Sequence, residues 1–171
     1  MGVNQRAQIV MSDDEVREFL EQSRVVTIAT NGPSGTPHLV AMWYALIDGE
    51  IWFETKAKSQ KVVNLRRDDR ITCHVEAGYS YDQLRGVSIE GHAEVIEDQD
   101  LIFEVGKGVW ERYTGPYTEE MRPAVEAMIS KRVAVRVRPH RVRSWDHRKL
   151  GYPDMPVSGT TAQYIEQPKL S

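Results

Sequence analysis

The sequence lacks the patterns that mark disulfide-rich, zinc-finger and membrane-spanning proteins. Its 171 residues include one cysteine, Cys73, so no disulfide can form within the chain and no cysteine spacing fits a metal site. No apolar run approaches the roughly 20 residues that a membrane-spanning helix requires. The polar first ten residues lack the apolar core of a secretory signal. We therefore expect a cytoplasmic protein without a membrane segment.

The sequence also lacks a strong excess of either charge. It contains 22 lysines and arginines against 25 aspartates and glutamates, which gives a formal net charge of −3. This balance provides no field over the whole protein that would attract nucleic acid or anionic lipid. We therefore expect neither nucleic acid nor a membrane surface as a partner.

Local patterns predict six strands and four helices. Ser12 and Glu15 form a capping box that predicts the start of a helix, and Asp48-Gly49 predicts a tight hairpin turn. The strands are expected at residues 25–30, 38–46, 51–54, 71–76, 86–96 and 133–145, and the helices at residues 12–22, 58–67, 99–112 and 118–129.

The order of these elements favours a mainly β fold, a six-stranded antiparallel barrel with flanking helices, over a doubly wound sheet. The connections are short, and helices do not alternate with strands as they do in parallel sheets. One domain is expected at residues 12–150, after a flexible N-terminus at residues 1–11. Residues 151–171 are rich in Gly, Pro, Ser and Thr, which predicts an irregular tail.

The most informative segment runs from Thr55 to Asp68, where a predicted strand leads into a predicted helix. It holds five basic residues and no acidic residue before Asp68: Lys56, Lys58, Lys61, Arg66 and Arg67. Free backbone amides and the positive end of the helix dipole favour an anion at such a junction. Lys58 and Lys61, with the Ser59 hydroxyl between them, therefore predict a phosphate site. A solvated helix face is the alternative interpretation, and spacing alone does not separate the two.

Other candidate groups have ordinary structural interpretations. None of the five histidines is paired at helical spacing or completed by a cysteine or carboxylate into a metal set, so no metal is expected. No nucleophile and base occur together, so the catalytic residues stay unassigned. The apolar stripe of Ile102, Phe103, Val109 and Trp110 fits a core or an interface, with a lid over a substrate as the alternative.

Several short motifs occur in a specific order between residues 12 and 150. They are the strand at 25–30 followed by Gly35-Thr36-Pro37-His38, then residues 40–44, 48–53, 58–70 and 85–95. Each motif alone is weak, but their order and spacing resemble the pyridoxamine 5′-phosphate oxidase-like family. Its members are split β-barrels, also called FMN-binding split barrels, which bind a flavin or the deazaflavin coenzyme F420.

The resemblance implies a homodimer that holds its cofactor in a groove at the interface. The strand at residues 40–44 would pass the ring system, the segment from Lys56 to Asn64 would hold the phosphate, and Trp145 would reach the partner's cofactor. The cofactor-binding residues implied are Met42, Trp43, Thr55, Lys56, Lys58, Ser59, Lys61, Asn64, Trp145 and Arg148.

Two features of the sequence favour F420 as the cofactor. The closing strand of those oxidases ends in an Arg-Leu-x-Pro type terminus, whereas here Trp145 is followed by Asp-His-Arg-Lys-Leu-Gly and a polar tail. F420 also carries a phosphodiester and a glutamate tail, which Lys56, Arg66, Arg67 and Arg70 are expected to meet.

The resemblance therefore implies an F420-dependent oxidoreductase that transfers a hydride between the reduced deazaflavin and a small organic substrate. Two alternatives stay open. One is an FMN-binding enzyme like pyridoxamine phosphate oxidase, and the other is a non-catalytic module that binds a cofactor or haem.

Overall fold

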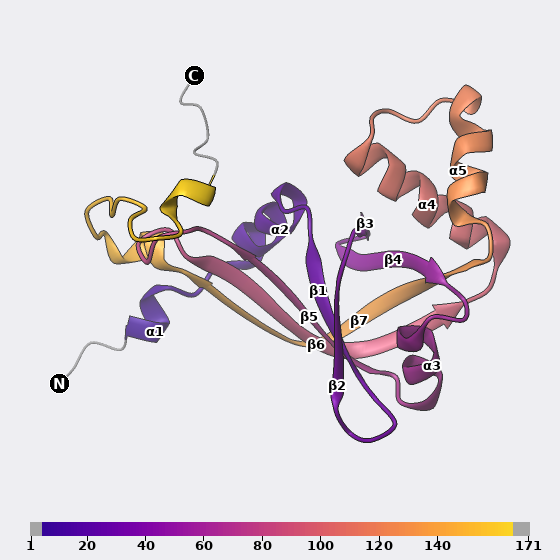
Figure 1. Ribbon diagram of the computed structural model, residues 1–171, viewed down its shortest axis with the longest axis horizontal. Coiled ribbons are helices and arrows are strands. Elements are labelled where there is room, and N and C mark those ends of the chain that lie inside the picture. Colours follow the sequence, from indigo (N-terminus) through magenta and orange to yellow (C-terminus); the bar gives the residue numbers. More distant parts are fainter. Residues whose placement is uncertain (1–4, 166–171) are drawn as a thin grey trace.

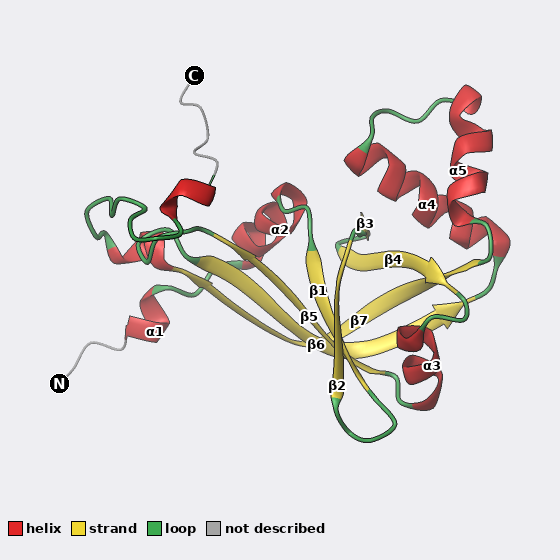
Figure 2. Ribbon diagram, viewed as in Figure 1, coloured by secondary structure: helices red, strands yellow, loops and turns green. Residues whose placement is uncertain are grey.

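A strongly curled antiparallel sheet forms the body of the protein in the computed structural model, which describes residues 5–165 (Figure 1, Figure 2). The strands are β1 (Val26–Asn31), β2 (Pro37–Met42), β3 (Ala45–Ile47), β4 (Glu50–Lys56), β5 (Arg70–Ala77), β6 (Arg85–Ile96) and β7 (Arg132–Asp146). The helices are α1 (Gln5–Gln8), α2 (Asp13–Gln22), α3 (Gln60–Arg67), α4 (Gln99–Tyr113) and α5 (Arg122–Ile129). Short 3-10 turns occur at Glu119–Met121, His147–Leu150 and Ala162–Tyr164. The predicted mainly β fold with flanking helices is confirmed.

The two edges of the sheet are consecutive in the chain. The strands of residues 5–165 form one sheet in the order β2-β1-β5-β6-β7-β4-β3, so β2 and β3 lie at opposite edges. Only Trp43 and Tyr44 separate these two strands. The sequence predicted a single strand at residues 38–46. It divides at Trp43 and Tyr44, which gives seven strands in the described chain instead of six.

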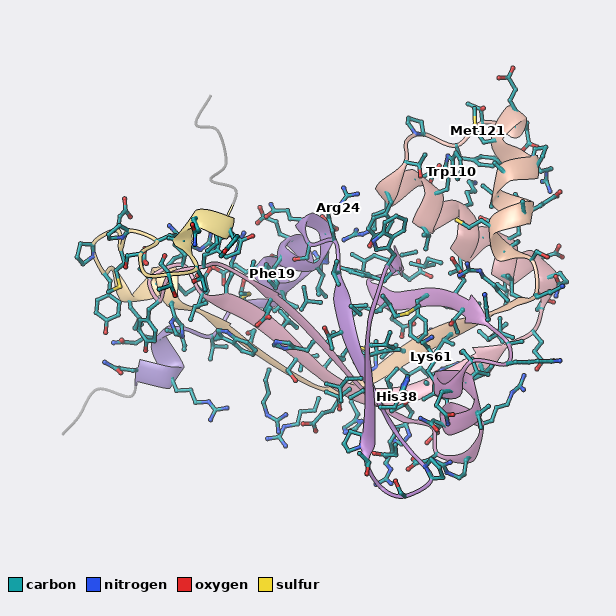
Figure 3. All side chains as sticks on the ribbon, viewed as in Figure 1. Phe19, Arg24, His38, Lys61, Trp110 and Met121 are labelled. Carbon is teal, nitrogen blue, oxygen red and sulfur yellow. The ribbon has the colours of Figure 1, made fainter. Side chains whose placement is uncertain are left out.

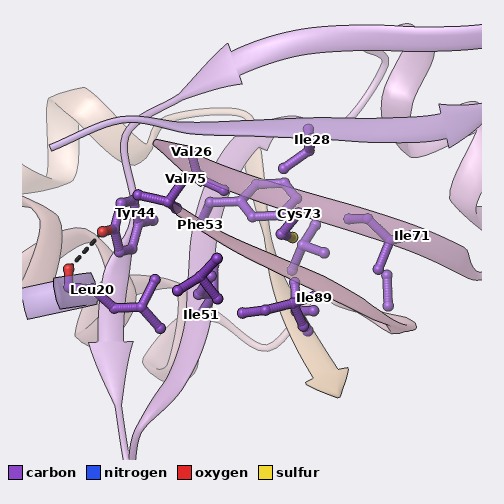
Figure 4. Close-up of a cluster of buried hydrophobic side chains, with 14 of the residues drawn as sticks. Leu20, Val26, Ile28, Tyr44, Ile51, Phe53, Ile71, Cys73, Val75 and Ile89 are labelled. Atoms are coloured by element: carbon purple, nitrogen blue, oxygen red, sulfur yellow. Dashed lines mark hydrogen bonds between the residues drawn. The ribbon is translucent and has the colours of Figure 1, made fainter. Parts of the chain in front are cut away.

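The inner face of the curled sheet holds the main hydrophobic core (Figure 4). Side chains alternate along β1, where Val26 and Ile28 are fully buried. Tyr44 is also fully buried, and its hydroxyl donates a hydrogen bond to the carbonyl of Leu20 over 2.6 Å. Burial raises the pKa of Tyr44 to about 12. The guanidinium of Arg112 lies 4.4 Å from the centre of its ring. The residue that ends the β2–β3 link therefore also anchors the end of α2.

A second cluster packs α4 against the outer face of the sheet. Ile102 and Val109 of the predicted stripe are buried there with Trp52 and Ala134. This supports a core role for those two residues of the stripe. Gly106 lies where α4 meets α5, and a Cβ at this position would stand 2.4 Å from the Cγ2 atom of Ile129.

Strands β6 and β7 extend from this cluster to the opposite end of the long axis, and β7 carries the chain there (Figure 1). There the backbone amide of Asp146 bonds to the carbonyl of Ile9 over 2.7 Å, and the amide of Met11 bonds to the Ser144 hydroxyl over 3.0 Å. The predicted terminal segments, 1–11 and 151–171, lie partly outside the described residues, at 1–4 and 166–171. No helix within the described chain is long and apolar enough to cross a membrane.

The Tyr44 hydroxyl offers a direct test of how the β2–β3 link is held. Tyr44→Phe removes a buried hydrogen bond and leaves the Leu20 carbonyl with one donor fewer. We expect a loss of about 1–2 kcal/mol in the free energy of unfolding, measured by urea denaturation. Tyr79→Phe is the matched control, because Tyr79 is exposed. Equal effects of the two substitutions would contradict this account.

Candidate functional site

The junction between β4 and α3 gathers the central residues of the predicted phosphate site. Strand β4 ends at Lys56, and Ser59 precedes the first turn of α3. The Ser59 amide bonds back to the Lys56 carbonyl over 2.9 Å, which makes the turn tight. The Ser59 hydroxyl makes no capping bond to the helix, unlike the hydroxyl of Ser12 on α2. It lies 3.5 Å from the Thr55 hydroxyl and is available to a ligand.

Lys61 turns back towards the end of β4 instead of extending into solvent (Figure 3). Its Nζ atom donates a hydrogen bond to Thr55 Oγ1 over 3.0 Å. Burial, and then the positive charge of Arg132, lower the pKa of Lys61, while the negative charge of Glu54 opposes the shift. Lys61, Thr55 and Ser59 therefore form one polar cluster, which we call the anion cluster. Lys61 therefore does not fit the alternative interpretation of a solvated helix face. Lys56 and Lys58, in contrast, are exposed.

Asn64 has a different place from the one implied by the resemblance. It is fully buried, and its Nδ2 atom donates to Thr30 Oγ1 over 3.0 Å. Its Oδ1 atom accepts a bond from Gln60 Nε2 over 2.8 Å. The Asn64 amide thus ties α3 to β1, and so it helps to position Lys61, which α3 carries.

The arginines of the segment are bonded to the protein itself. Arg66 pairs with Glu97, and Arg67 donates to the Asn31 carbonyl. Arg70 pairs with Asp68 over 2.6 Å. Within residues 5–165, Lys56 and Lys58 form no ion pair. The arginines therefore have partners within the chain, whereas Lys56 and Lys58 are exposed without an ion pair, and the contact of the arginines with a cofactor tail stays a prediction.

A buried ion pair beside the anion cluster was missed by the sequence. Glu54 is 8% exposed, and its Oε2 atom accepts a hydrogen bond from Arg132 Nη1 over 2.6 Å. Burial raises the pKa of Glu54, and Arg132 lowers it. An acidic residue within an otherwise buried strand is a signal that a partner exists. The partner lies 78 positions further along the chain, so the sequence does not reveal which residue it is.

Trp43 and Met42 lie on the link between the sheet edges. Trp43 is 54% exposed and stacks on Tyr113 with the ring centres 4.4 Å apart. Met42 ends β2 and is partly buried against the core. Ala45 pairs with Trp52 on β4, three residues before Thr55. Thr55, the first residue of the anion cluster, therefore lies about 10 Å along β4 from Trp52, which pairs with the residue after the link.

Trp145 and Arg148 lie far from the anion cluster in the same chain. Trp145 pairs with Gly86, where a Cβ would stand 2.4 Å from a carbon of its indole ring, so glycine lets the ring lie flat on β6. The guanidinium of Arg148 is held by Asp146 over 2.6 Å. Strand β7 separates both from Arg132, and Figure 1 shows its two ends at opposite ends of the long axis. The chain does not bring these two residues to the anion cluster.

The described residues hold no preformed metal cluster and no reactive thiol. Among residues 5–165, no group of three or more His, Cys, Asp or Glu side chains is arranged to hold a metal. Burial raises the pKa of the Cys73 thiol to about 12, so it is a poor nucleophile. A cavity of about 610 Å³ lies between α4 and the strands, and one of about 690 Å³ lies beside α4 and α5. Neither includes a predicted site residue.

Comparisons with known proteins identify related chains. A family model described as pyridoxamine 5′-phosphate oxidase matches residues 12–146. The crystal structure of the conserved hypothetical protein Rv2991 from Mycobacterium tuberculosis is 61% identical, with 91% of this chain and 98% of that chain covered and a TM-score of 0.90. A search of curated protein sequences found no match.

Two more distant structures share the fold. An F420 reductase is 28% identical over 74% of this chain and 94% of that chain, with a TM-score of 0.56. The haem storage protein HutZ from Vibrio cholerae is 13% identical over 78% of this chain and 96% of that chain, with a TM-score of 0.62. The second likeness shows the fold alone.

The buried amide of Asn64 makes a testable contribution to this site. Asn64→Ala leaves the Thr30 hydroxyl and the Gln60 amide without their partner and opens a small cavity. We expect a loss of about 2–3 kcal/mol in the free energy of unfolding, measured by chemical denaturation. Gln60→Ala is the control, since Gln60 is exposed and is expected to cost clearly less. Similar losses for both would show that Asn64 does not anchor α3.

Proposed function

Because the chain belongs to the pyridoxamine 5′-phosphate oxidase family, we propose that it is an oxidoreductase that uses coenzyme F420 on a small organic substrate and works as a homodimer. The observation that carries the proposal is the anion cluster. Lys61 supplies a positive charge, and Thr55 and Ser59 supply hydroxyl groups. Thr55 Oγ1 lies 3.0 Å from Lys61 Nζ and 3.5 Å from Ser59 Oγ. This combination fits a phosphate, since charge-assisted hydrogen bonds to phosphate oxygens are strong.

Three observations support F420 as the cofactor. The F420 reductase is related at 28% identity over most of both chains. The residues after Trp145 depart from the terminus of the flavin oxidases. The exposed lysines Lys56 and Lys58 flank the cluster, where they can meet a negatively charged tail outside the phosphate. Because Arg66, Arg67 and Arg70 have partners within the chain, this third observation rests on the lysines.

The placement of Trp145 and exposed apolar residues supports a homodimer. Leu39 on β2 is 61% exposed, and Trp43, which follows the end of the same strand, is also exposed. Aromatic residues such as tryptophan are enriched at protein interfaces. Trp145 and Arg148 lie too far along β7 to complete the anion cluster of their own chain, so they would complete that of a partner related by two-fold symmetry.

The chain's own residues would bind and orient the cofactor. When bound, F420 supplies the hydride chemistry. Lys61, Ser59 and Thr55 would hold its phosphate, and the link at Met42 and Trp43 would lie alongside the ring. Cys73 is buried and protonated, so the protein's part is placement and exclusion of water, with no covalent step on a side chain.

A fluorescence titration with F420 tests this proposal. We expect saturable binding by the wild-type protein, and a loss of affinity of about tenfold or more in Lys58→Ala/Lys61→Ala, since the variant loses the Lys61 contact to the phosphate and the Lys58 charge that meets the tail. Arg66→Ala/Arg67→Ala is the matched control, because it removes two charges from the same helix that are bonded elsewhere. Equal weakening by both pairs would place the phosphate elsewhere. A purified protein with flavin bands or a Soret band and no F420 binding would instead support flavin or haem.

The lowered pKa of Lys61 predicts how binding depends on pH. A phosphate binds the charged form of this lysine, so affinity should fall as the pH rises through its pKa. Because burial lowers that pKa, the midpoint should lie below the usual value of about 10.4 for lysine. Titrations of F420 binding from neutral to alkaline pH measure the midpoint. Lys61→Arg should remove this component, and an unchanged profile would exclude Lys61 from the site.

A further inference from the structure

The cavity of about 610 Å³ beside α4 takes no part in the proposed function. It lies between α4, the hairpin of β3 and β4, and strands β6 and β7 (Figure 1). Trp52 lines it and packs with Val105 of α4 in the second hydrophobic cluster. Residues three apart on a strand face opposite sides of a sheet, so this cavity and Thr55 lie on opposite faces of β4. The volume falls within the range of roughly 300–1,000 Å³ that is typical of small-molecule sites.

The indole of Trp52 carries a hydrogen-bond donor that has no acceptor among the described residues. Only 7% of Trp52 is exposed, and its Nε1 atom is buried without a hydrogen-bond partner. An indole N–H can only donate, and a buried donor that stays unpaired is unfavourable. The guanidinium of Arg136 lies 5.4 Å from the centre of the Trp52 rings. A ligand that brings an oxygen atom past Arg136 to the indole edge would supply the acceptor.

The rim of the cavity carries more carboxylates than cations. The four carboxylates that line it are those of Asp48, Glu94, Glu104 and Glu111. Glu94 pairs with Arg138 over 2.7 Å. Glu104 pairs with Lys107 over 3.9 Å. The other two carboxylates form no ion pair within residues 5–165.

The cations of the cavity do not balance this negative charge. Arg136 lines the cavity, but its guanidinium is bonded to Glu50. The lining residues and their ion-pair partners together comprise five carboxylates and three cations, which leaves a net charge of −2. Glu111 also lies in the last turn of α4, where the negative end of the helix dipole adds to its field. This field disfavours an anion such as F420 and favours a cation.

We propose that this cavity is a second binding site, which takes a small organic amine with an apolar body and an ether or carbonyl oxygen. The apolar body lies along Trp52 and Val105, and the oxygen accepts the hydrogen bond of Trp52 Nε1. The ammonium group faces the unpaired carboxylates of Asp48 and Glu111. Because the cavity and the anion cluster occupy opposite faces of β4, this inference does not depend on the cofactor.

Three ligands of closely similar shape test the preference for a cation. At neutral pH, 2-(4-methoxyphenyl)ethylamine is a cation, 2-(4-methoxyphenyl)ethanol is neutral and 3-(4-methoxyphenyl)propanoate is an anion. Each is titrated into isotope-labelled protein while NMR follows the indole N–H signals of the four tryptophans. The signal that is lost in Trp52→Phe identifies Trp52.

We expect saturable binding of the amine that moves the Trp52 signal. The alcohol should bind about tenfold more weakly, and the propanoate more weakly still, because neither can pair with the carboxylates of the rim. Equal affinity for the amine and the propanoate would overturn the inference. So would the absence of saturable amine binding at millimolar concentrations, or binding that leaves the Trp52 signal in place.

A pair of charge substitutions locates the ammonium group. Asp48→Asn/Glu111→Gln removes the two unpaired carboxylates and should weaken binding of the amine about tenfold. The change at Asp48 preserves the hairpin turn, since Asn before Gly49 also tolerates positive φ. Asp100→Asn/Glu120→Gln is the matched control, because it removes the same charge from exposed residues outside this cavity. Equal weakening by both pairs would show that the amine responds only to the net charge of the protein, which contradicts a site in the cavity.

A fourth ligand tests the hydrogen bond to Trp52. In 2-(4-ethylphenyl)ethylamine, a methylene group replaces the methoxy oxygen. Relative to the wild-type protein, Trp52→Phe should shift the ratio of the two amine affinities about fivefold towards the ethyl compound, because it keeps an aromatic ring but lacks the donor. An unchanged ratio in the folded variant would contradict the role of Trp52. Thermal unfolding checks each variant, and the ligand series with the charge pairs stays decisive if Trp52→Phe does not fold.

Titration of the amine into Lys58→Ala/Lys61→Ala separates this site from the anion cluster. Wild-type affinity is expected, since neither lysine lines the cavity. A loss of amine binding in this variant would place the amine at the cofactor site and overturn the inference. Failure of the wild-type protein to bind F420 would defeat the proposed function alone.

Discussion

The link between β2 and β3 joins the two edges of the curled sheet, and much of the structure depends on it. Trp43 and Tyr44 leave the hydrogen-bond ladder, and the Tyr44 amide instead donates to the Tyr113 hydroxyl over 3.1 Å. The Tyr44 ring enters the core, where its hydroxyl bonds to Leu20 and its face contacts Arg112. One short link thus fastens both sheet edges to α2 and α4. Among the described residues the two outer strands, β2 and β3, do not pair with one another, so this short link is what joins them.

The pairing of β4 and the attachment of α3 explain how the anion cluster is held together. Strand β4 is next to the β3 edge, and it pairs along its length with β7, which fixes Thr55 opposite Val133. Helix α3 is tied to β1 by the buried Asn64 amide. The pairing of β4 with β7 and the bond between α3 and β1 therefore hold Lys61 and Ser59 close to Thr55. Preorganised donors of this kind bind an anion without further ordering of side chains.

The sequence predicted the features that depend on neighbouring residues. The Ser12–Glu15 capping box is formed in both directions, and Asp48 and Gly49 both adopt positive φ in the predicted hairpin turn. The grouping of Lys61 with Ser59 followed from their spacing at the start of a helix. These features were predictable because the contacts that decide them lie within a few positions of one another.

Features set by distant partners were not predictable in this way. The division of the strand at residues 38–46 depends on Tyr113, which is remote in sequence. The pair of Glu54 with Arg132 and the pair of Arg66 with Glu97 likewise join separate elements. The sequence showed five cations in one segment, but the fold decides which of them are already bonded. Trp145 was predicted to act on a partner's cofactor; it lies far along β7 from the anion cluster of its own chain, and its contact with a partner stays a prediction.

The central claim is that two chains share each cofactor site, with the anion cluster from one and Trp145 from the other. The most direct measurement mixes Lys58→Ala/Lys61→Ala protein with Trp145→Ala protein, after unfolding and refolding together, and counts F420-binding sites by titration. If each site uses both chains of a symmetric dimer, mixed dimers regain one intact site, and about a quarter of all sites should recover. If the number of sites stays at the level of the separate variants, the cofactor site is not shared in this way.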